Sequence, residues 1–225
     1  MTRIKGLYPV TPDLADTAAL VGQVETVLAG GAQLLQYRNK TAAPALRREQ
    51  AAALLAVCRR QGAMLIINDD VELARELGAD GVHVGADDAA VAVARTRLGS
   101  DKIIGASCYN DLNRARAAAA QGADYIAFGS FFASSVKPGA VRAQLSLLFA
   151  ARELGLPVVA IGGITSLMKS PPGLARLARQ AWHPPSTSTG ALERTTVPVM
   201  SPSDPAATWT TSNASRSKPM SVPAA

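Results

Sequence analysis

The chain has 225 residues, of which 48% are hydrophobic and 4% aromatic, and this length suits one sizeable domain with a large core. No apolar run approaches a membrane span, and the first residues lack the apolar segment of a signal peptide. The two cysteines, Cys58 and Cys108, have no metal-ligand spacing and are too few for a disulfide scaffold. We therefore predict a cytoplasmic protein with no membrane partner.

The net charge of +6 raises the question of nucleic-acid binding. Residues 1–165 hold 17 Lys and Arg against 15 Asp and Glu, whereas residues 166–225 hold 6 against 2. The larger segment is nearly balanced, and no basic stripe with interleaved aromatic residues is present. We therefore predict no nucleic-acid partner. The sequence leaves both a monomer and a homo-oligomer open.

Short apolar runs alternate along the chain with Ala-rich segments of helical spacing. The predicted strands span residues 6–10, 32–37, 64–67, 81–84, 103–106, 125–128 and 158–161. The predicted helices span residues 46–60, 71–77, 89–98, 112–121 and 141–154. Because the strand runs are apolar on both faces, as buried parallel strands are, this alternation predicts a parallel α/β fold.

Two parallel α/β architectures compete for this pattern. The first strand is not followed by the G-x-G-x-x-G fingerprint of a dinucleotide-binding doubly wound sheet. Polar residues follow nearly every strand instead of gathering at one crevice, which favours a TIM-type (β/α)₈ barrel.

The composition changes after Thr165. Nine of the fourteen prolines but only two of the eighteen glycines lie in residues 166–225. We predict a short helix over residues 174–181, no strand beyond it, and a tail that is largely disordered. The domain organisation expected is an incomplete barrel over residues 1–165 and a tail over residues 166–225. The eighth βα unit is then missing or replaced, as a frameshift or an altered terminus would produce.

The stretch Gln36-Tyr37-Arg38-Asn39-Lys40 follows a predicted buried strand. While the backbone stays extended, Gln36, Arg38 and Lys40 share one face. An amide and two cations at the carboxyl end of a strand suit a phosphorylated ligand. A solvated basic loop is the alternative for this motif taken alone.

Carboxylates follow the next two strands. In Asn68-Asp69-Asp70 the second carboxylate is placed to cap the following helix, which leaves Asp69 facing the barrel mouth. In the segment that ends in Asp88, again one carboxylate can cap a helix and the other can face inward. Two hard oxygen ligands from adjacent strand ends are typical of a Mg²⁺ site shared with substrate phosphates. His83 lies within its strand, which favours a core histidine over a catalytic base.

The later strands end in small and hydroxyl-bearing residues. Ser107 follows the fifth predicted strand, and the loop after the sixth carries Ser134 and Lys137, a composition suited to an anion lid. The seventh strand ends in Gly162-Gly163, where a phosphate could approach backbone N–H groups. Each feature alone also fits an ordinary turn, but together they predict a site for a Mg²⁺-bound diphosphate and a second phosphate.

In this order and spacing the motifs resemble the thiamine-phosphate synthase (thiamine-phosphate pyrophosphorylase) family over roughly residues 4–165. The motifs that carry the resemblance are Tyr8-Pro9-Val10-Thr11, Gln36-x-Arg38-x-Lys40, Asn68-Asp69, Gly81-Val82-His83-Val84-Gly85 with Asp88, Gly105-Ala106-Ser107, the loop ending in Lys137, and Ala160-Ile161-Gly162-Gly163-Ile164. The resemblance implies a transferase of thiamine biosynthesis that joins 4-amino-2-methyl-5-hydroxymethylpyrimidine diphosphate to 4-methyl-5-(2-hydroxyethyl)thiazole phosphate. The products are thiamine monophosphate and pyrophosphate.

The resemblance also implies a role for each matching residue. The pyrimidine diphosphate would be held by Gln36, Arg38, Lys40, Asn68, Ser107 and Lys137, of which Arg38, Lys40, Ser107 and Lys137 are the catalytic candidates. Ser134 and Gly163 would contact the thiazole phosphate, and Asp69 and Asp88 would bind Mg²⁺. The chain departs from the family pattern at Ala86, at Ser135-Val136 and after Thr165. Two alternatives therefore stay open: a related thiazole tautomerase, and an inactive barrel that only binds phosphate ligands.

Overall fold

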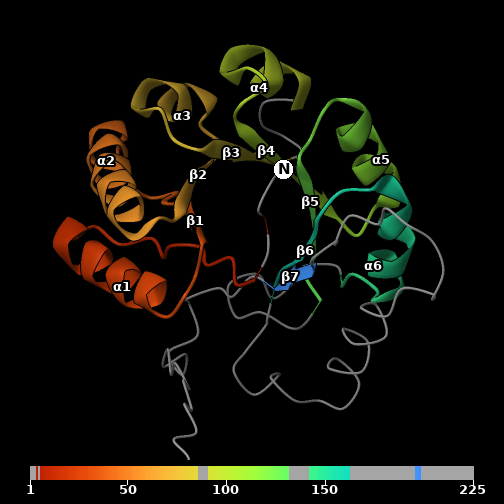
Figure 1. The fold of residues 1–225 in the computed structure, drawn as a ribbon, viewed down its shortest axis with the longest axis horizontal. Coiled ribbons are helices and arrows are strands. Elements are labelled where there is room, and N and C mark those ends of the chain that lie inside the picture. The colour runs from red at the N-terminus through yellow and green to blue at the C-terminus, as the bar shows by residue number, and fades with distance from the viewer. Residues whose placement is uncertain (1–3, 5, 86–90, 132–141, 163–195, 199–225) are drawn as a thin grey trace, which may run out of the picture.

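The structure, a computed structural model, describes residues 4, 6–85, 91–131, 142–162 and 196–198. In these residues a seven-stranded parallel sheet keeps the strand order of the sequence, β1-β2-β3-β4-β5-β6-β7. The strands are β1 (Leu34–Tyr37), β2 (Met64–Asn68), β3 (Gly81–Val84), β4 (Ile103–Tyr109), β5 (Tyr125–Phe128), β6 (Val158–Ala160) and β7 (Thr196–Pro198). The sheet is strongly curved, and the helices lie along its convex side (Figure 1).

The helices alternate with the strands, as βαβ connections require. They are α1 (Thr17–Ala29), α2 (Pro44–Gln61), α3 (Val71–Leu77), α4 (Val91–Leu98), α5 (Leu112–Ala120) and α6 (Ser146–Ala150), the last followed by a 3₁₀ turn over Ala151–Leu154. Aspartates cap three of them: Asp16, Asp70 and Asp111 each accept a hydrogen bond from a backbone N–H of the first helical turn. These caps fix where the chain leaves a strand end and turns back along the sheet.

A repeated Gly-Ala-Asp phrase ties the helices to the strands that follow. Gly78 ends α3 in the left-handed conformation, at φ +66°, which glycine adopts without steric cost. The carboxylate of Asp80 then accepts a hydrogen bond of 2.8 Å from the backbone N–H of Leu65 in the neighbouring strand. Asp124 repeats this contact with the N–H of Ile104 at 2.7 Å. The repeat therefore pins the amino ends of adjacent strands to each other.

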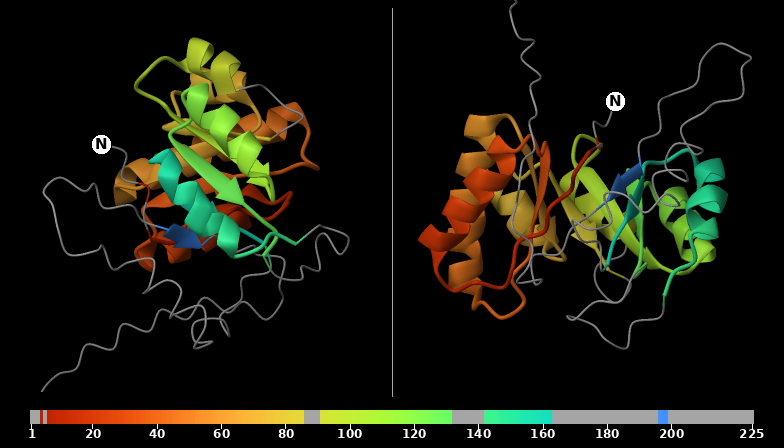
Figure 2. Two further views of the ribbon diagram at one scale, coloured as in Figure 1. Left: turned by 90° about the vertical axis from the view of Figure 1, so that its right-hand side faces the viewer. Right: turned by 90° about the horizontal axis from the view of Figure 1, so that it is seen from below.

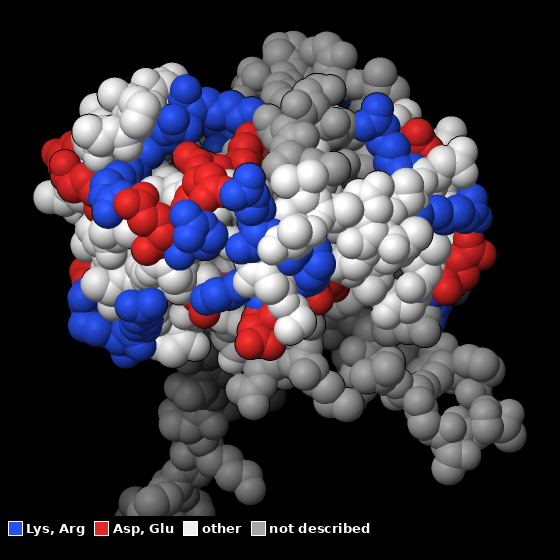
Figure 3. Space-filling model, turned by 90° about the horizontal axis from the view of Figure 1, so that it is seen from above, with Lys and Arg blue, Asp and Glu red and all other residues white. Residues whose placement is uncertain are grey.

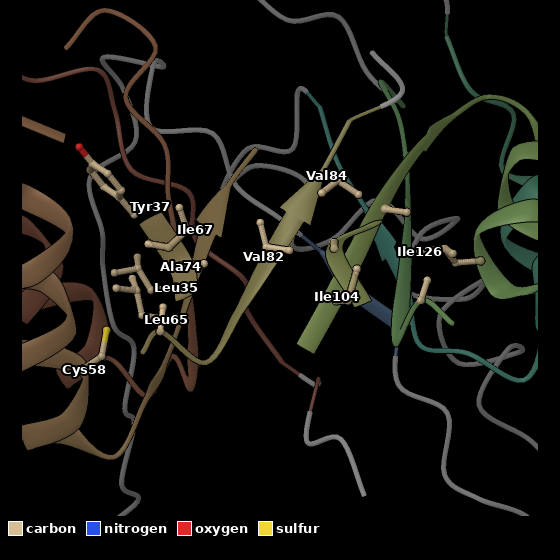
Figure 4. Close-up of a cluster of buried hydrophobic side chains, with 14 of the residues drawn as sticks. Leu35, Tyr37, Cys58, Leu65, Ile67, Ala74, Val82, Val84, Ile104 and Ile126 are labelled. Carbon is tan, nitrogen blue, oxygen red and sulfur yellow. The ribbon is translucent and has the colours of Figure 1, made fainter. Parts of the chain in front are cut away.

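The sheet separates two hydrophobic clusters. The larger lies between the convex face and the helices, where outward-facing side chains such as Leu35, Leu65, Val82 and Ile104 pack (Figure 4). The smaller lines the concave face and comprises Ile4, Tyr8, Leu34, Ile66, Tyr125, Ala127 and Val159. The segment from Ile4 to Val10 runs along this concave side (Figure 2). Because strand residues alternate between the two faces, every second residue of each strand points to the concave side.

Charged side chains of both signs are intermixed on the surface shown in Figure 3. Ion pairs also lie on the outer helices: Arg48 with Glu76, and both Arg75 and Arg97 with Glu72. Among the described residues, no helix combines the length and the apolar character needed to cross a membrane.

The parallel α/β fold predicted from the sequence is confirmed for a curved sheet of six strands, β1–β6, that begin and end close to the predicted bounds. The first predicted strand, residues 6–10, is reduced to one parallel bridge between Val10 and Gln36. Helix α1 was not predicted, although Leu20, Val24 and Leu28 follow helical spacing and are buried.

The prediction that no strand follows residue 181 is wrong. The tail contributes β7, which pairs in parallel with β6 in the register Val158↔Thr196. This segment is short and contains a proline, so its sequence does not resemble a central strand. The split between residues 1–165 and 166–225 stays a prediction.

Candidate functional site

Gln36 is the first predicted site residue in chain order, and it lies on the concave face. Its side chain is 6% exposed, and its Nε2 donates a hydrogen bond of 3.1 Å to the hydroxyl of Tyr8. Its neighbour Tyr37 points to the opposite face, where its hydroxyl donates to Gln50 of α2 at 2.9 Å. The alternation of the strand therefore places Gln36 inside the curve, as predicted.

Arg38 and Lys40 lie beyond the last residue of β1, so strand alternation no longer sets their direction. Asp13 organises both residues: it pairs with the Arg38 guanidinium at 3.2 Å and accepts from the backbone N–H of Lys40 at 3.0 Å. The hydroxyl of Thr11 both accepts from Arg38 N–H at 2.8 Å and donates to the Arg38 carbonyl at 2.9 Å. The two cations thus lie at the rim of the sheet, held by Asp13, which was not among the predicted site residues.

Asp69 lies at the carboxyl end of β2, within reach of Lys40. The Lys40 Nζ is 3.4 Å from an Asp69 carboxylate oxygen, and Asn68 donates to the same oxygen at 2.6 Å. Asp69 has a positive φ of 65°, a conformation that costs energy for a residue with a Cβ. Asp70 caps α3 through Leu73 N–H at 2.9 Å, as predicted. The carboxylate of Asp69 is therefore left at the rim, next to a cation.

A cavity of about 270 Å³ opens beside this ion pair. It is lined by Tyr37, Asn39, Lys40, Arg47, Ile67, Asn68, Asp69, Asp70 and Leu73. Its walls come from the ends of β1 and β2 and from the starts of α2 and α3. The Lys40–Asp69 pair is therefore next to open space at the strand ends.

Ser107 lies on β4 and contacts the buried His83 of β3. The Nε2 of His83 is 2.8 Å from Ser107 Oγ, and its Nδ1 is 2.9 Å from the Tyr125 hydroxyl. Burial lowers the pKa of His83 to about 4, because removal from water disfavours the charged ring. His83 is a neutral core histidine with both ring nitrogens bonded, as the sequence indicated.

Two tyrosines on the concave face complete this polar cluster, and neither was predicted to have a role in the site. The hydroxyls of Tyr8 and Tyr125 are 2.8 Å apart, and both rings are buried. Burial raises the pKa of both phenols. The Tyr125 ring occupies the place where a Cβ on Gly105 would stand. A tyrosine opposite a glycine on neighbouring strands was the sequence signal for this packing.

The other predicted residues, Asp88, Ser134, Lys137 and Gly163, lie outside the described residues. Gly162, next to Gly163, has φ +88°, and a Cβ there would run into Ser130. The backbone at Gly162 is therefore in the left-handed region that favours glycine, and the phosphate contact at Gly163 stays a prediction.

The oxygen donors at the rim fit a hard cation. Asp69 supplies a carboxylate that is 25% exposed and faces the open rim, and such oxygens are the ligands Mg²⁺ prefers. The described part of the chain brings together no cluster of three or more His, Cys, Asp or Glu side chains. A Mg²⁺ ion held there would depend on few protein ligands and on the substrate's own phosphates.

The fold and the strand-end residues define a parallel α/β protein with its polar groups at the carboxyl ends of the strands, where such proteins bind ligands. Comparison with known proteins gives the family. The family model described as thiamine monophosphate synthase matches residues 7–168. A thiamine-phosphate synthase of Methylobacillus flagellatus is 62% identical over 162 residues, which cover 72% of this chain and 78% of the relative. One from Azoarcus is 58% identical over 164 residues, covering 72% and 80%.

Solved structures agree with this match. A thiamine phosphate pyrophosphorylase from Pyrococcus furiosus superposes with a TM-score of 0.67 at 29% identity, covering 86% of this chain and 85% of that one. A truncated 3-deoxy-D-arabino-heptulosonate 7-phosphate synthase from Thermotoga maritima has a TM-score of 0.59 at 15% identity, covering 88% and 74%, which shows a shared fold only.

The chain therefore belongs to the thiamine monophosphate synthase family. As a member of this family it is a transferase. The resemblance predicted from its motifs is confirmed.

Proposed function

We propose that this chain joins 4-amino-2-methyl-5-hydroxymethylpyrimidine diphosphate to 4-methyl-5-(2-hydroxyethyl)thiazole phosphate, forming thiamine monophosphate and pyrophosphate in thiamine biosynthesis. One observation supports this most directly. A cation and a carboxylate from adjacent strand ends, Lys40 and Asp69, meet at 3.4 Å in a chain that is 62% identical to a thiamine-phosphate synthase. A diphosphate with a bound divalent cation needs this combination of charges.

The pyrimidine diphosphate lies against the rim between β1 and β4. Arg38 and Lys40 bind its phosphates, and Lys137 supplies a third cation. Gln36, Asn68 and Ser107 contact it from the concave face. The thiazole phosphate is held by Ser134 and by the backbone N–H of Gly163.

Charge stabilisation carries the reaction. As the bond to the diphosphate breaks, negative charge grows on the leaving pyrophosphate, and the cations bound to it lower the barrier. The pyrimidine methylene becomes cationic and is attacked by the thiazole nitrogen. No protein nucleophile is required. Asp69 and Asp88 hold Mg²⁺, which when bound spreads the charge of the leaving pyrophosphate.

The proposal includes the architecture and the location of the protein. The curved parallel sheet forms most of a TIM-type barrel whose strand ends face the substrates. The protein acts in the cytoplasm on small phosphorylated molecules, without nucleic-acid or membrane partners, as a monomer or a homo-oligomer. Both cysteines are free thiols and buried, which agrees with a reducing compartment.

The test is direct synthesis. The purified full chain is mixed with both phosphates and Mg²⁺, and thiamine monophosphate and pyrophosphate are measured. Asp69→Asn should lower kcat/KM by about a hundredfold and weaken the dependence on Mg²⁺. Asp111→Asn is the matched control. Asp111 also follows a strand end, but it caps α5 through Asn113 N–H, and asparagine caps as well as aspartate does.

Two results would contradict the proposal. If the chain binds pyrophosphate with Mg²⁺ but forms no thiamine monophosphate, it is a ligand-binding protein instead of a synthase. If Asp69→Asn leaves the Mg²⁺ dependence unchanged, Asp69 is not a metal ligand.

A further inference from the structure

Four consecutive hydrogen bonds cross the concave face and end at Ser107. Gln36 Nε2 lies 3.1 Å from the Tyr8 hydroxyl, and the Tyr8 and Tyr125 hydroxyls are 2.8 Å apart. The Tyr125 hydroxyl is 2.9 Å from His83 Nδ1, and His83 Nε2 is 2.8 Å from Ser107 Oγ. The five residues come from the amino-terminal segment and from β1, β3, β4 and β5. Among the described residues they form one continuous series of hydrogen-bonded polar atoms.

The direction of every bond in this chain follows from its first member. An amide nitrogen can only donate, so the Tyr8 oxygen accepts from Gln36. Tyr8 has a single hydroxyl proton, and among the described residues its available acceptor is the Tyr125 oxygen at 2.8 Å, so this proton goes to Tyr125. The Tyr125 oxygen is thereby used as an acceptor, and its own proton goes to Nδ1 of His83.

A neutral imidazole carries one proton, so an accepting Nδ1 places that proton on Nε2. His83 is 6% exposed, and its Nδ1, 2.9 Å from the Tyr125 hydroxyl, carries no proton of its own when it accepts from that hydroxyl. Nε2 therefore donates to Ser107 Oγ at 2.8 Å. With its oxygen already accepting, the Ser107 hydroxyl is left with one proton to give.

We propose that Tyr8, Tyr125 and His83 are positioning residues that orient the Ser107 hydroxyl as a hydrogen-bond donor toward a phosphate oxygen of the bound diphosphate. The ligand class in this proposal rests on the proposed function. The direction of the hydrogen bonds does not rest on the proposed function, because it follows from the protein's own contacts.

The opposite direction would suit an anion poorly. If the Gln36 amide were rotated, its oxygen would accept from Tyr8 and each later bond would reverse. Ser107 would then give its proton to His83 Nε2 and could only accept. A phosphate oxygen has no proton to offer at neutral pH, so Ser107 would repel it. The amide orientation of Gln36 thus decides whether the inner end of the site attracts or repels an anion.

The first experiment reads the His83 proton directly. The full chain is labelled with ¹⁵N-histidine, and the ring nitrogens are observed by NMR at pH 7. The sequence has two histidines, and a His83→Gln variant identifies which signals belong to His83. We expect protonated Nε2 and bare Nδ1. The reverse tautomer would overturn the proposal. Because no turnover is needed, a failure here is distinct from a failure of the proposed synthesis.

Variants then test whether the hydrogen bonds from Gln36 to Ser107 set the His83 tautomer. Tyr125→Phe should remove the single tautomer and give a mixture, whereas Tyr37→Phe should leave the His83 signals unchanged. Tyr37 is the matched control because it also loses one buried hydroxyl, bonded to Gln50 on the other side of the sheet. If His83 keeps a single, unchanged tautomer in Tyr125→Phe, the hydrogen bonds from Gln36 to His83 do not set that tautomer. Tyr8→Phe repeats the test one bond further away, in case Tyr125→Phe folds poorly.

Binding of Mg²⁺-pyrophosphate tests the last step. Ser107→Ala should weaken binding about tenfold, the usual effect of losing one hydrogen bond to a charged group. Tyr125→Phe should weaken it about threefold, because Ser107 stays but is no longer oriented. If Ser107→Ala binds pyrophosphate as tightly as the original chain, Ser107 is not a donor to this anion and that part of the proposal is wrong.

Discussion

The concave face of the sheet and its rim are held together by different forces. On the concave face, Tyr8, His83 and Tyr125 are buried and neutral, and each bonds to the next. At the rim, Lys40 and Asp69 are charged, with side chains 55% and 25% exposed. Buried hydrogen bonds are expensive to break, whereas partly exposed ion pairs are worth little to stability.

This difference predicts where a substitution acts mainly on stability and where it acts mainly on ligand binding. Substitutions on the concave face should reduce the free energy of unfolding, because they disturb close packing and leave polar atoms unpaired. Substitutions at the rim should reduce ligand binding and turnover and leave the fold almost unchanged. Under the proposed function, Lys40 would exchange Asp69 for a substrate phosphate, and Asp69 would exchange Lys40 for a cation.

Gly105→Ala should show the largest effect on the concave face. The new Cβ would stand inside the Tyr125 ring, so the ring must move and break its bonds to Tyr8 and His83. We expect a loss of about 4 kcal/mol in the free energy of unfolding, measured with urea. Gly22→Ala is the control. Gly22 lies within α1 with nothing near its missing Cβ, and the change should add up to about 1 kcal/mol. A Gly105→Ala variant as stable as the original would contradict this packing.

The pH dependence of stability should show the next largest effect. Burial lowers the pKa of His83 to about 4, against about 6.5 in an unfolded chain. Between these values the unfolded chain binds a proton that the folded chain does not. Stability from this group is therefore complete above about pH 6.5 and falls by about 3 kcal/mol as the pH drops to 4.

Urea unfolding between pH 7 and pH 4.5 measures this dependence. The His83→Gln variant should lose that share of the pH dependence, because glutamine does not titrate. If both proteins lose stability equally as the pH falls, His83 is not buried and neutral in the folded protein.

The sequence predicted the direction of Gln36 on the concave face, but not the contacts that hold the rim cations. Strand alternation places Gln36 inside the curve, and this needs only the local backbone. Arg38 and Lys40 follow the end of β1, and their directions depend on Asp13, which is distant in the sequence. Alternation says nothing about such a contact. The hydrogen bonds through Tyr8 and Tyr125 were not predicted for the same reason, since their residues come from the amino-terminal segment and from different strands.

The fold was predictable where local pattern and tertiary structure agree. The apolar runs of β2 to β5 and the capped helix α3 were found because each carries its own signal. Helix α1 was missed although its buried residues have helical spacing. Strand β7 is a strand only because β6 offers it a partner. Its three residues carry no pattern of their own, so tertiary context decides.

Asp13→Asn should have the smallest effect on stability and a larger one on binding. It removes the charge that pairs with Arg38 at 3.2 Å and weakens the contact to Lys40 N–H at 3.0 Å. Because the pair is partly exposed, we expect a loss of about 0.5 kcal/mol in the free energy of unfolding. The KM for the pyrimidine diphosphate should rise about threefold, because the loop that carries both cations is less well positioned.

The matched control for Asp13 is Glu25→Gln, which removes an ion pair with Arg60 at 2.9 Å on the outer helices. It should change stability by a similar amount and leave KM unchanged. A lower KM in Asp13→Asn would show that Asp13 competes with the substrate for Arg38 instead of positioning it. Arg38 would then stay paired with Asp13 until a substrate phosphate displaces the Asp13 carboxylate.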